Sequence, residues 1–224
     1  MFSKRGLDYL AGVLLVAMVA TVVAGIATDP ISADTFREDA RGVLADIVKD
    51  RDLFIVSQAF FLASSFISIV MAAGLYVVFR SHDRTLALIG SFGFLAGAVL
   101  MLTTNMVGIS LISLAEDYAG TQSESLLSVA SAVGLMKDVA FAMGAVGIAM
   151  GVLSYGLLIL TTNAIPRWMG IFGIAGGIVT PFGWLLFVDS DLALIVFVGL
   201  SISLFFALIS GGWLVYRGAS EANN

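Results

Sequence analysis

The chain has 224 residues, of which 59% are hydrophobic and only 12% are charged, and its formal net charge is −5. Water-soluble domains are about 45–50% apolar and about 25% charged, so this composition excludes an ordinary soluble domain and predicts a protein that folds in lipid. With no cysteine and one histidine, the chain has no disulfide, no thiolate metal site and no multi-histidine metal or haem centre. We expect no cofactor or metal and, because no basic run occurs, no nucleic-acid partner.

Apolar stretches long enough to cross a bilayer, about 20 residues each, recur six times along the chain. The predicted spans are residues 7–28, 53–80, 85–112, 137–160 (within a longer helix at 126–160), 168–188 and 192–215. Short connections make consecutive helices antiparallel neighbours. The prediction is an all-α, polytopic membrane protein, a six-helix transmembrane bundle forming one domain over residues 1–224.

The first span raises the alternative of a cleaved signal peptide. Lys4-Arg5 is typical of the start of such a peptide, and Gly25-Ile26-Ala27 is similar to a cleavage site. The apolar stretch of about 20 residues is longer than the 7–15 residues usual for a signal peptide. We therefore interpret it as a retained helix.

The segment at about 35–50 is polar overall but has a helical pattern. Thr35-x-x-Glu38 has the form of a capping box. Apolar residues then recur at helical spacing: Phe36, Ala40, Val43, Leu44, Ile47 and Val48. This predicts a short extracytoplasmic amphipathic helix that lies on the membrane surface or caps the bundle. A partner could dock there, but packing on its own bundle is favoured.

Lysine and arginine set the orientation, because cytoplasmic segments are enriched in them. With the N-terminus inside, each inner segment has at least one basic residue: Lys4, Arg5, Arg80, Arg84, Arg167 and Arg217. The outer loops at 113–125 and 189–191 have none, and acids outnumber the basic residues in the first outer loop. We predict a multi-pass plasma-membrane protein with both termini in the cytoplasm. The outer acids are interpreted as loop-solvating groups in preference to an acidic docking surface.

Five short motifs occur in an order that resembles a known family. They are Val43-Leu44-Ala45-Asp46-Ile47-Val48, Asp52-Leu53-Phe54-Ile55-Val56, Gly74-Leu75-Tyr76, Arg84-Thr85-Leu86-Ala87-Leu88 and Ile165-Pro166-Arg167-Trp168-Met169-Gly170. The chain resembles the prokaryotic membrane family catalogued as domain of unknown function 4386 over nearly its whole length. The resemblance implies a six-helix membrane fold and brings no activity and no catalytic residues.

Small residues one helical turn apart mark where helices approach closely. The motifs are Gly93-x-x-x-Gly97, Gly147-x-x-x-Gly151 and Gly173-x-x-x-Gly177. In lipid, such faces let backbones pack together. They join helices within the chain or mediate self-association or contact with other membrane subunits, and the first is favoured. Pro181 predicts a kink in the fifth span.

Ionisable residues inside a span are candidates for a functional role, because placing each one in the membrane costs about 2.5–3.5 kcal/mol on insertion scales. In the sequence, only Lys137 and Asp138 meet this condition. The helix at 126–160 has about 35 residues and a length of about 52 Å, whereas the hydrocarbon is about 30 Å thick. Lys137 and Asp138 are therefore predicted at the outer interface or in the outer third of the membrane, not at its midplane.

Three polar residues of the second and third spans are predicted at the same level: Gln58, Thr104 and Asn105. With Lys137 and Asp138 they form a candidate ligand-binding set around an outward-opening pocket. A plainer interpretation is a snorkelling lysine and an aspartate that ties its helix to the cap. The binding interpretation divides into a lipid-headgroup or small-molecule site and a proton or ion path.

No arrangement typical of catalysis is found. Ser64, Ser65 and Ser68 have no histidine near them in the membrane and are predicted to form interhelical hydrogen bonds. His82 is interpreted as a solvated residue of a tight turn. The predicted function is non-catalytic, as an accessory or structural subunit of a membrane complex or as a lipid- or small-ligand-binding bundle. The alternative is a small transporter that uses the pocket around Lys137 and Asp138.

Overall fold

The computed structural model describes residues 4–30, 36–162, 165–182 and 193–220. These ranges contain the α-helices α1 (Lys4–Thr28), α2 (Phe36–Lys49), α3 (Arg51–Phe79), α4 (Arg84–Thr121), α5 (Glu124–Thr161), α6 (Arg167–Val179) and α7 (Ala193–Ser220), and a 3₁₀ turn at 180–182. The predicted all-α class is confirmed. Five of these helices are long and apolar enough to cross a membrane, namely α1, α3, α4, α5 and α7.

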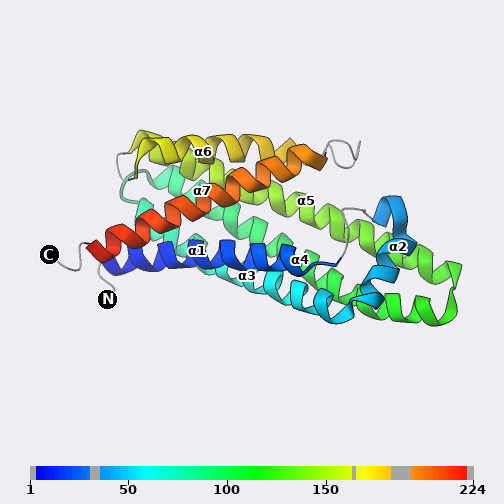
Figure 1. Ribbon diagram of the computed structural model, residues 1–224. Coiled ribbons are helices and arrows are strands. Elements are labelled where there is room, and N and C mark those ends of the chain that lie inside the picture. Colours follow the sequence, from blue (N-terminus) through cyan, green and yellow to red (C-terminus); the bar gives the residue numbers. More distant parts are fainter. Residues whose placement is uncertain (1–3, 31–35, 163–164, 183–192, 221–224) are drawn as a thin grey trace.

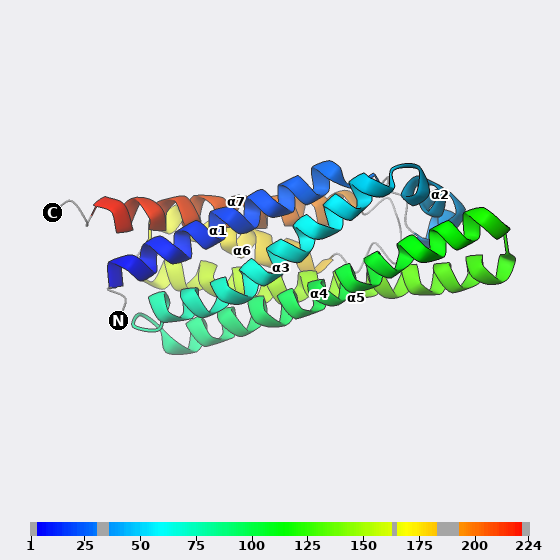
Figure 2. The same ribbon diagram turned by 90° about the horizontal axis from the view of Figure 1, so that it is seen from below.

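The helices other than α2 form a closed ring (Figures 1 and 2). Helix α1 packs on α3 and α7, and the ring continues through the pairs α3–α4, α4–α5, α5–α6 and α6–α7. Helix α1 begins, α7 ends and α3 turns into α4 at one end of the ring, which we call the terminal end (left in Figure 1). Helix α2 and the α4–α5 turn lie at the opposite end, the cap end.

The inner core of the ring is a cluster of buried apolar residues from all six helices. Its centre is aromatic: the ring of Tyr155 lies 5.4 Å from that of Phe79 and 5.9 Å from that of Phe94. The Tyr155 hydroxyl is 2.6 Å from Ser91 Oγ and donates to the carbonyl of Ala87 at 3.3 Å. A cavity of about 20 Å³ remains among these rings and the residues of α1 and α7.

The three predicted glycine motifs join helices within the chain. A Cβ added to Gly147 would lie 2.8 Å from the Cα of Gly97, so the backbones of α4 and α5 touch there. A Cβ on Gly173 of α6 would likewise lie 2.8 Å from the Cα of Gly156 on α5. Glycine therefore provides the close approach that apolar burial does not drive in lipid.

Helices α4 and α5 extend well beyond the rest of the ring at the cap end (Figure 2). Each has 38 residues, a length of about 57 Å. The long fourth predicted helix is confirmed, but the predicted loop at 113–125 is wrong. Helix α4 continues to Thr121, and the turn is confined to Gln122, with φ of 52°, and Ser123. Glu116 and Asp117 suggested a loop, yet a helix outside the hydrocarbon carries charges without cost.

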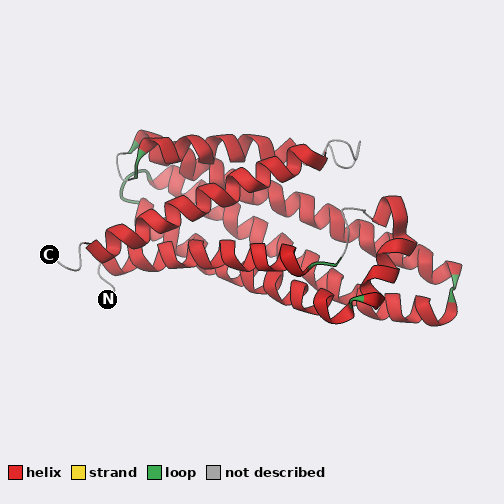
Figure 3. Ribbon diagram, viewed as in Figure 1, coloured by secondary structure: helices red, strands yellow, loops and turns green. Residues whose placement is uncertain are grey.

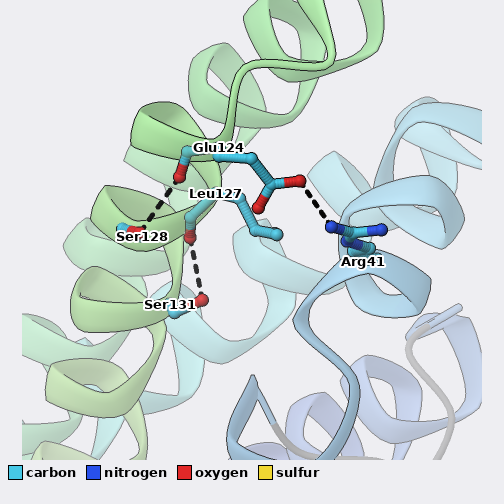
Figure 4. A network of polar contacts seen from close by, with 5 residues as sticks. All are labelled: Arg41, Glu124, Leu127, Ser128 and Ser131. Atoms are coloured by element: carbon cyan, nitrogen blue, oxygen red, sulfur yellow. Dashed lines mark hydrogen bonds and ion pairs between the residues drawn. The ribbon is translucent and has the colours of Figure 1, made fainter.

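Helix α2 packs on its own bundle, as favoured from the sequence. Buried apolar residues of α2, α3, α4 and α5 form a second cluster, the cap core: Val43, Leu44, Ile47, Phe54, Leu111, Ala115, Tyr118 and Ala130. Arg41 of α2 pairs with Glu124 at the start of α5 (Figure 4). Arg51 donates to Glu116 of α4 at 2.7 Å. Two of the outer acids therefore join helices instead of only solvating loops.

The predicted capping box of Thr35 and Glu38 cannot be compared with the start of α2, because Thr35 and the Glu38 side chain lie outside the described residues. The helix is kinked at Asp39, whose φ and ψ of −145° and 78° are non-helical. The Asp39 carboxylate accepts a hydrogen bond from the Gly42 amide at 2.8 Å. Asp39 thus caps the segment that follows, because a short acidic side chain satisfies an amide that has no partner within the helix.

The fifth and sixth predicted spans are described in part. Helix α6 ends at Val179, and Pro181 lies in the 3₁₀ turn at residues 180–182 that follows it directly. Residues 183–188 of the predicted span at 168–188 lie outside the described residues. Helix α7 runs on to Ser220, five residues past the predicted end. Figure 3 shows the described parts of the chain as helices joined by short loops and turns.

Candidate functional site

A polar layer separates the inner core from the cap core on three adjacent helices. We define it by Ser57, Gln58 and Ser65 on α3, Thr104, Asn105 and Gly108 on α4, and Lys137 and Asp138 on α5. On α3 the layer lies between Phe54 of the cap core and Met71 of the inner core. On α4 and α5 it also lies between residues of the two cores. The set predicted from the sequence thus falls within one zone of the fold.

The depth of the polar layer follows from helix geometry. Gln58 and Asn105 are each about 21 residues, or about 31 Å, from the terminal end of their helices, and Lys137 is about 24 residues, or about 36 Å, from its own. The hydrocarbon is about 30 Å thick. If Arg80, Arg84 and Arg167 mark one boundary, the layer lies at the headgroup level of the other.

Gly108 is the point where α3, α4 and α5 meet in this layer. A Cβ added there would lie 2.5 Å from Gln58 Oε1 and 3.6 Å from Lys137 Cε. Gln58 and Lys137 are therefore brought together across a glycine. Gly108 was not predicted from the sequence, where its only signal is its position about one turn after Asn105 on the same helix.

Gln58 is buried without a partner. Its residue exposure is 1%, and neither Nε2 nor Oε1 has a hydrogen-bond partner among the described residues. The hydroxyl of Ser57, also fully buried, has none either. Most buried polar atoms in folded proteins are paired, so such groups require an explanation.

Asn105 and Thr104 are in different situations, although both are buried. The Asn105 amide donates to Ser65 Oγ across the α3–α4 contact, at 3.4 Å. The Thr104 hydroxyl donates to the carbonyl of Leu100, in its own helix, at 3.1 Å. Asn105 thus holds α4 against α3, whereas the Thr104 hydroxyl is satisfied within α4.

Lys137 and Asp138 are half-buried. Lys137 faces α4, as its contact position at Gly108 shows. Asp138 follows Gly134 and precedes Ala142 at four-residue spacing, and both of these are buried. The plainer interpretation requires a hydrogen bond or ion pair between Asp138 and the cap. Among the described residues we find none.

The serines of α3 mostly bond within their own helix. Ser64 and Ser65 donate to the carbonyl of Phe61, at 2.8 and 3.0 Å, and Ser68 donates to that of Ser64 at 2.8 Å. The predicted interhelical bonding therefore holds only for Ser65, which also accepts from Asn105. Helical serines reach the carbonyl one turn back, and the sequence does not distinguish this from a bond to a neighbouring helix. His82 is exposed in the α3–α4 turn.

A further ionisable residue inside a predicted span is Asp8, which was not foreseen. Asp8 lies in the predicted span at 7–28, its side chain is only 3% exposed, and its Oδ2 lies 3.7 Å from Arg217 Nε of α7. Lys137 and Asp138 are thus not alone, and the expectation that they were is wrong. The Asp8–Arg217 pair joins the first and last helices of the ring at the terminal end. The overlooked signal was an acid one turn into the first helix.

A ring of mostly long apolar helices that pack through glycine and carry a buried polar layer defines a polytopic helical membrane protein. The match to a family model extends over residues 10–218. The chain belongs to the family described as a domain of unknown function (DUF4386). No curated protein and no solved structure matches it.

Proposed function

We propose that this protein is a non-catalytic membrane bundle that binds a small polar ligand or lipid headgroup in the polar layer. The observation that carries the proposal is Gln58, a fully buried amide with no partner in the described fold, next to Lys137. An unsatisfied buried polar group costs about 1–3 kcal/mol. A ligand that accepts from Nε2 and donates to Oε1 removes that cost, because it replaces the missing partners.

The middle of the bundle supports binding over transport. Between the polar layer and the Asp8–Arg217 pair lies the inner core, where the rings of Phe79, Phe94 and Tyr155 meet. The residual cavity there is only about 20 Å³, about the space of one water molecule. A transporter needs a polar route through this level, and the described side chains there are mostly apolar.

The glycine contacts bear on the alternative of an accessory subunit. The glycine motifs, for which contact with a neighbouring subunit was the less favoured prediction, are used inside the chain, between α4 and α5 and between α5 and α6. Partners other than lipid therefore gain no support from these faces. The proposal keeps membrane lipids as the surrounding partners.

We further propose six spans and cytoplasmic termini in the plasma membrane, with the segment beginning at α6 as the fifth span. The ring supports this, because α6 packs between α5 and α7 as the other ring helices pack on their neighbours. The arginines at positions 80, 84, 167 and 217 all belong to the terminal end. Basic residues favour the cytoplasmic side.

The binding proposal is tested by purifying the full chain from native membranes in mild detergent and identifying co-purified molecules by mass spectrometry. The site variant carries Lys137→Leu and Asp138→Asn, and Lys49→Gln on the exposed face of α2 is the surface control. We expect the wild type and the control to retain a bound molecule that the site variant loses while its helical content and unfolding temperature persist. Equal retention by all three proteins overturns the proposal.

A further inference from the structure

The lateral surroundings of the polar layer are apolar and exposed. On α4, Met106 and Ile109 flank the glycine at 108 and are 68% and 47% exposed. On α5, Met136 and Val139 flank Lys137 and Asp138 and are 64% and 45% exposed. The half-buried charges therefore lie beside surfaces suited to lipid chains. The cap core covers the same three helices on the outer side.

We propose that the ligand of the polar layer is the headgroup of a phospholipid that carries a primary amine, with phosphoethanolamine as the chemistry recognised. This rests on the proposed function. The layer lies at headgroup depth when the terminal-end arginines mark the opposite boundary, and the exposed apolar side chains of Met136 and Val139 beside it suit acyl chains along α4 and α5. The headgroup then lies next to the half-buried Lys137 and Asp138.

The charges of the layer match a zwitterion. The Lys137 ammonium suits a phosphate oxygen, and the Asp138 carboxylate suits an ammonium group, so both charges are paired when one headgroup carries both signs. A headgroup with phosphate alone leaves the Asp138 carboxylate unpaired in a half-buried position. The unpartnered amide of Gln58 adds an NH₂ donor group and a carbonyl acceptor beside Lys137.

The chemistry also distinguishes a primary amine from a quaternary one. A primary ammonium donates hydrogen bonds to carboxylate and amide oxygens, which the layer provides through Asp138 and Gln58. A quaternary ammonium has no N–H and is usually bound within a cage of aromatic rings. The residues that define the layer are polar or glycine, so choline gains nothing there that ethanolamine lacks.

The test is a titration of the purified full chain, delipidated in detergent, followed by native mass spectrometry. Three probes share the same short acyl chains and carry ethanolamine, choline or glycerol headgroups, and free phosphoethanolamine is a fourth. We expect the ethanolamine lipid to bind about tenfold more tightly than the other two lipids, the effect of one charge-assisted hydrogen bond. Free phosphoethanolamine should bind far more weakly, because it lacks the acyl chains.

Three conservative variants locate the effect. Asp138→Asn should remove the preference for ethanolamine over glycerol and keep phospholipid binding, whereas Lys137→Gln should weaken all three lipids. Lys49→Gln should change nothing. Equal affinity of the wild type for the three lipids overturns the headgroup assignment, and the proposed function survives if Lys137→Gln still weakens binding. Free phosphoethanolamine binding as tightly as the lipid overturns the lipid source, and no effect of any variant overturns both proposals.

Discussion

Replacing Gln58 with methionine should stabilise the lipid-free protein. The amide is 1% exposed and both of its polar atoms lack partners in the described fold. Methionine has a similar length, no strong hydrogen-bonding group and enough flexibility to fit beside Gly108. Removing an unsatisfied buried polar group recovers about 1–3 kcal/mol of its desolvation penalty. We expect the free energy of unfolding to rise by that amount while ligand binding falls.

The assay is reversible unfolding in mixed micelles, followed by circular dichroism, on protein stripped of lipid. Asn105→Leu is the matched control, because that amide is bonded to Ser65. Its loss should cost about 0.6 kcal/mol, the average for hydrogen bonds between membrane helices. If Gln58→Met instead destabilises the lipid-free protein by more than about 1 kcal/mol, the amide has a partner within the fold and the reasoning from its isolation fails.

Three further outcomes test the architecture. Gly147→Ala should lower the free energy of unfolding by about 1–3 kcal/mol, as overpacking does, because its Cβ would meet the backbone of α4. Gly120→Ala is the control, because a Cβ there meets open space and should not lower stability. Thermal unfolding distinguishes the two variants. The chain lacks cysteine, so in intact cells an impermeant maleimide should label Ser125→Cys and spare Ser81→Cys, and the reverse pattern contradicts the orientation. Ile47→Ala, fully buried in the cap core, should cost about 2–4 kcal/mol and speed amide exchange in α2 alone; unchanged exchange there contradicts its role.

The sequence predicted the helices well where a single solvent determines their length. The thickness of the hydrocarbon sets the length of an apolar run that crosses it, so α1 and α3 begin and end close to the predicted spans. The prediction failed where a helix leaves the membrane. Helix α4 continues past Ile112 because its half at the cap end packs on α2 and α5. That contact is a feature of the tertiary structure and leaves no mark in the hydropathy of the sequence.

The sequence predicted the depth of the candidate site along the helices but not the contacts between its residues. Counting residues along each helix placed Gln58, Asn105 and Lys137 at one depth. Sequence spacing does not determine which side chain faces which neighbour, so Gly108 and the Asn105–Ser65 bond were not foreseen. The pairing of Asp8 with Arg217 joins the two ends of the chain, and only the closure of the ring brings those helices together.

The two cores on either side of the polar layer are stabilised by different forces. Around the inner core, lipid is the solvent, so apolar burial contributes little and α4 and α5 approach through glycine, as at Gly97 and Gly147. In the cap core, Leu111 and Tyr118 of α4 pack with Leu44 and Ile47 of α2, and α5 contributes Ala130. Such aliphatic burial stabilises the fold only where water is the solvent. The change from glycine packing to aliphatic packing therefore marks the boundary between the two solvents independently of helix length. On α4 it falls at the polar layer, the level proposed above for the phospholipid headgroup.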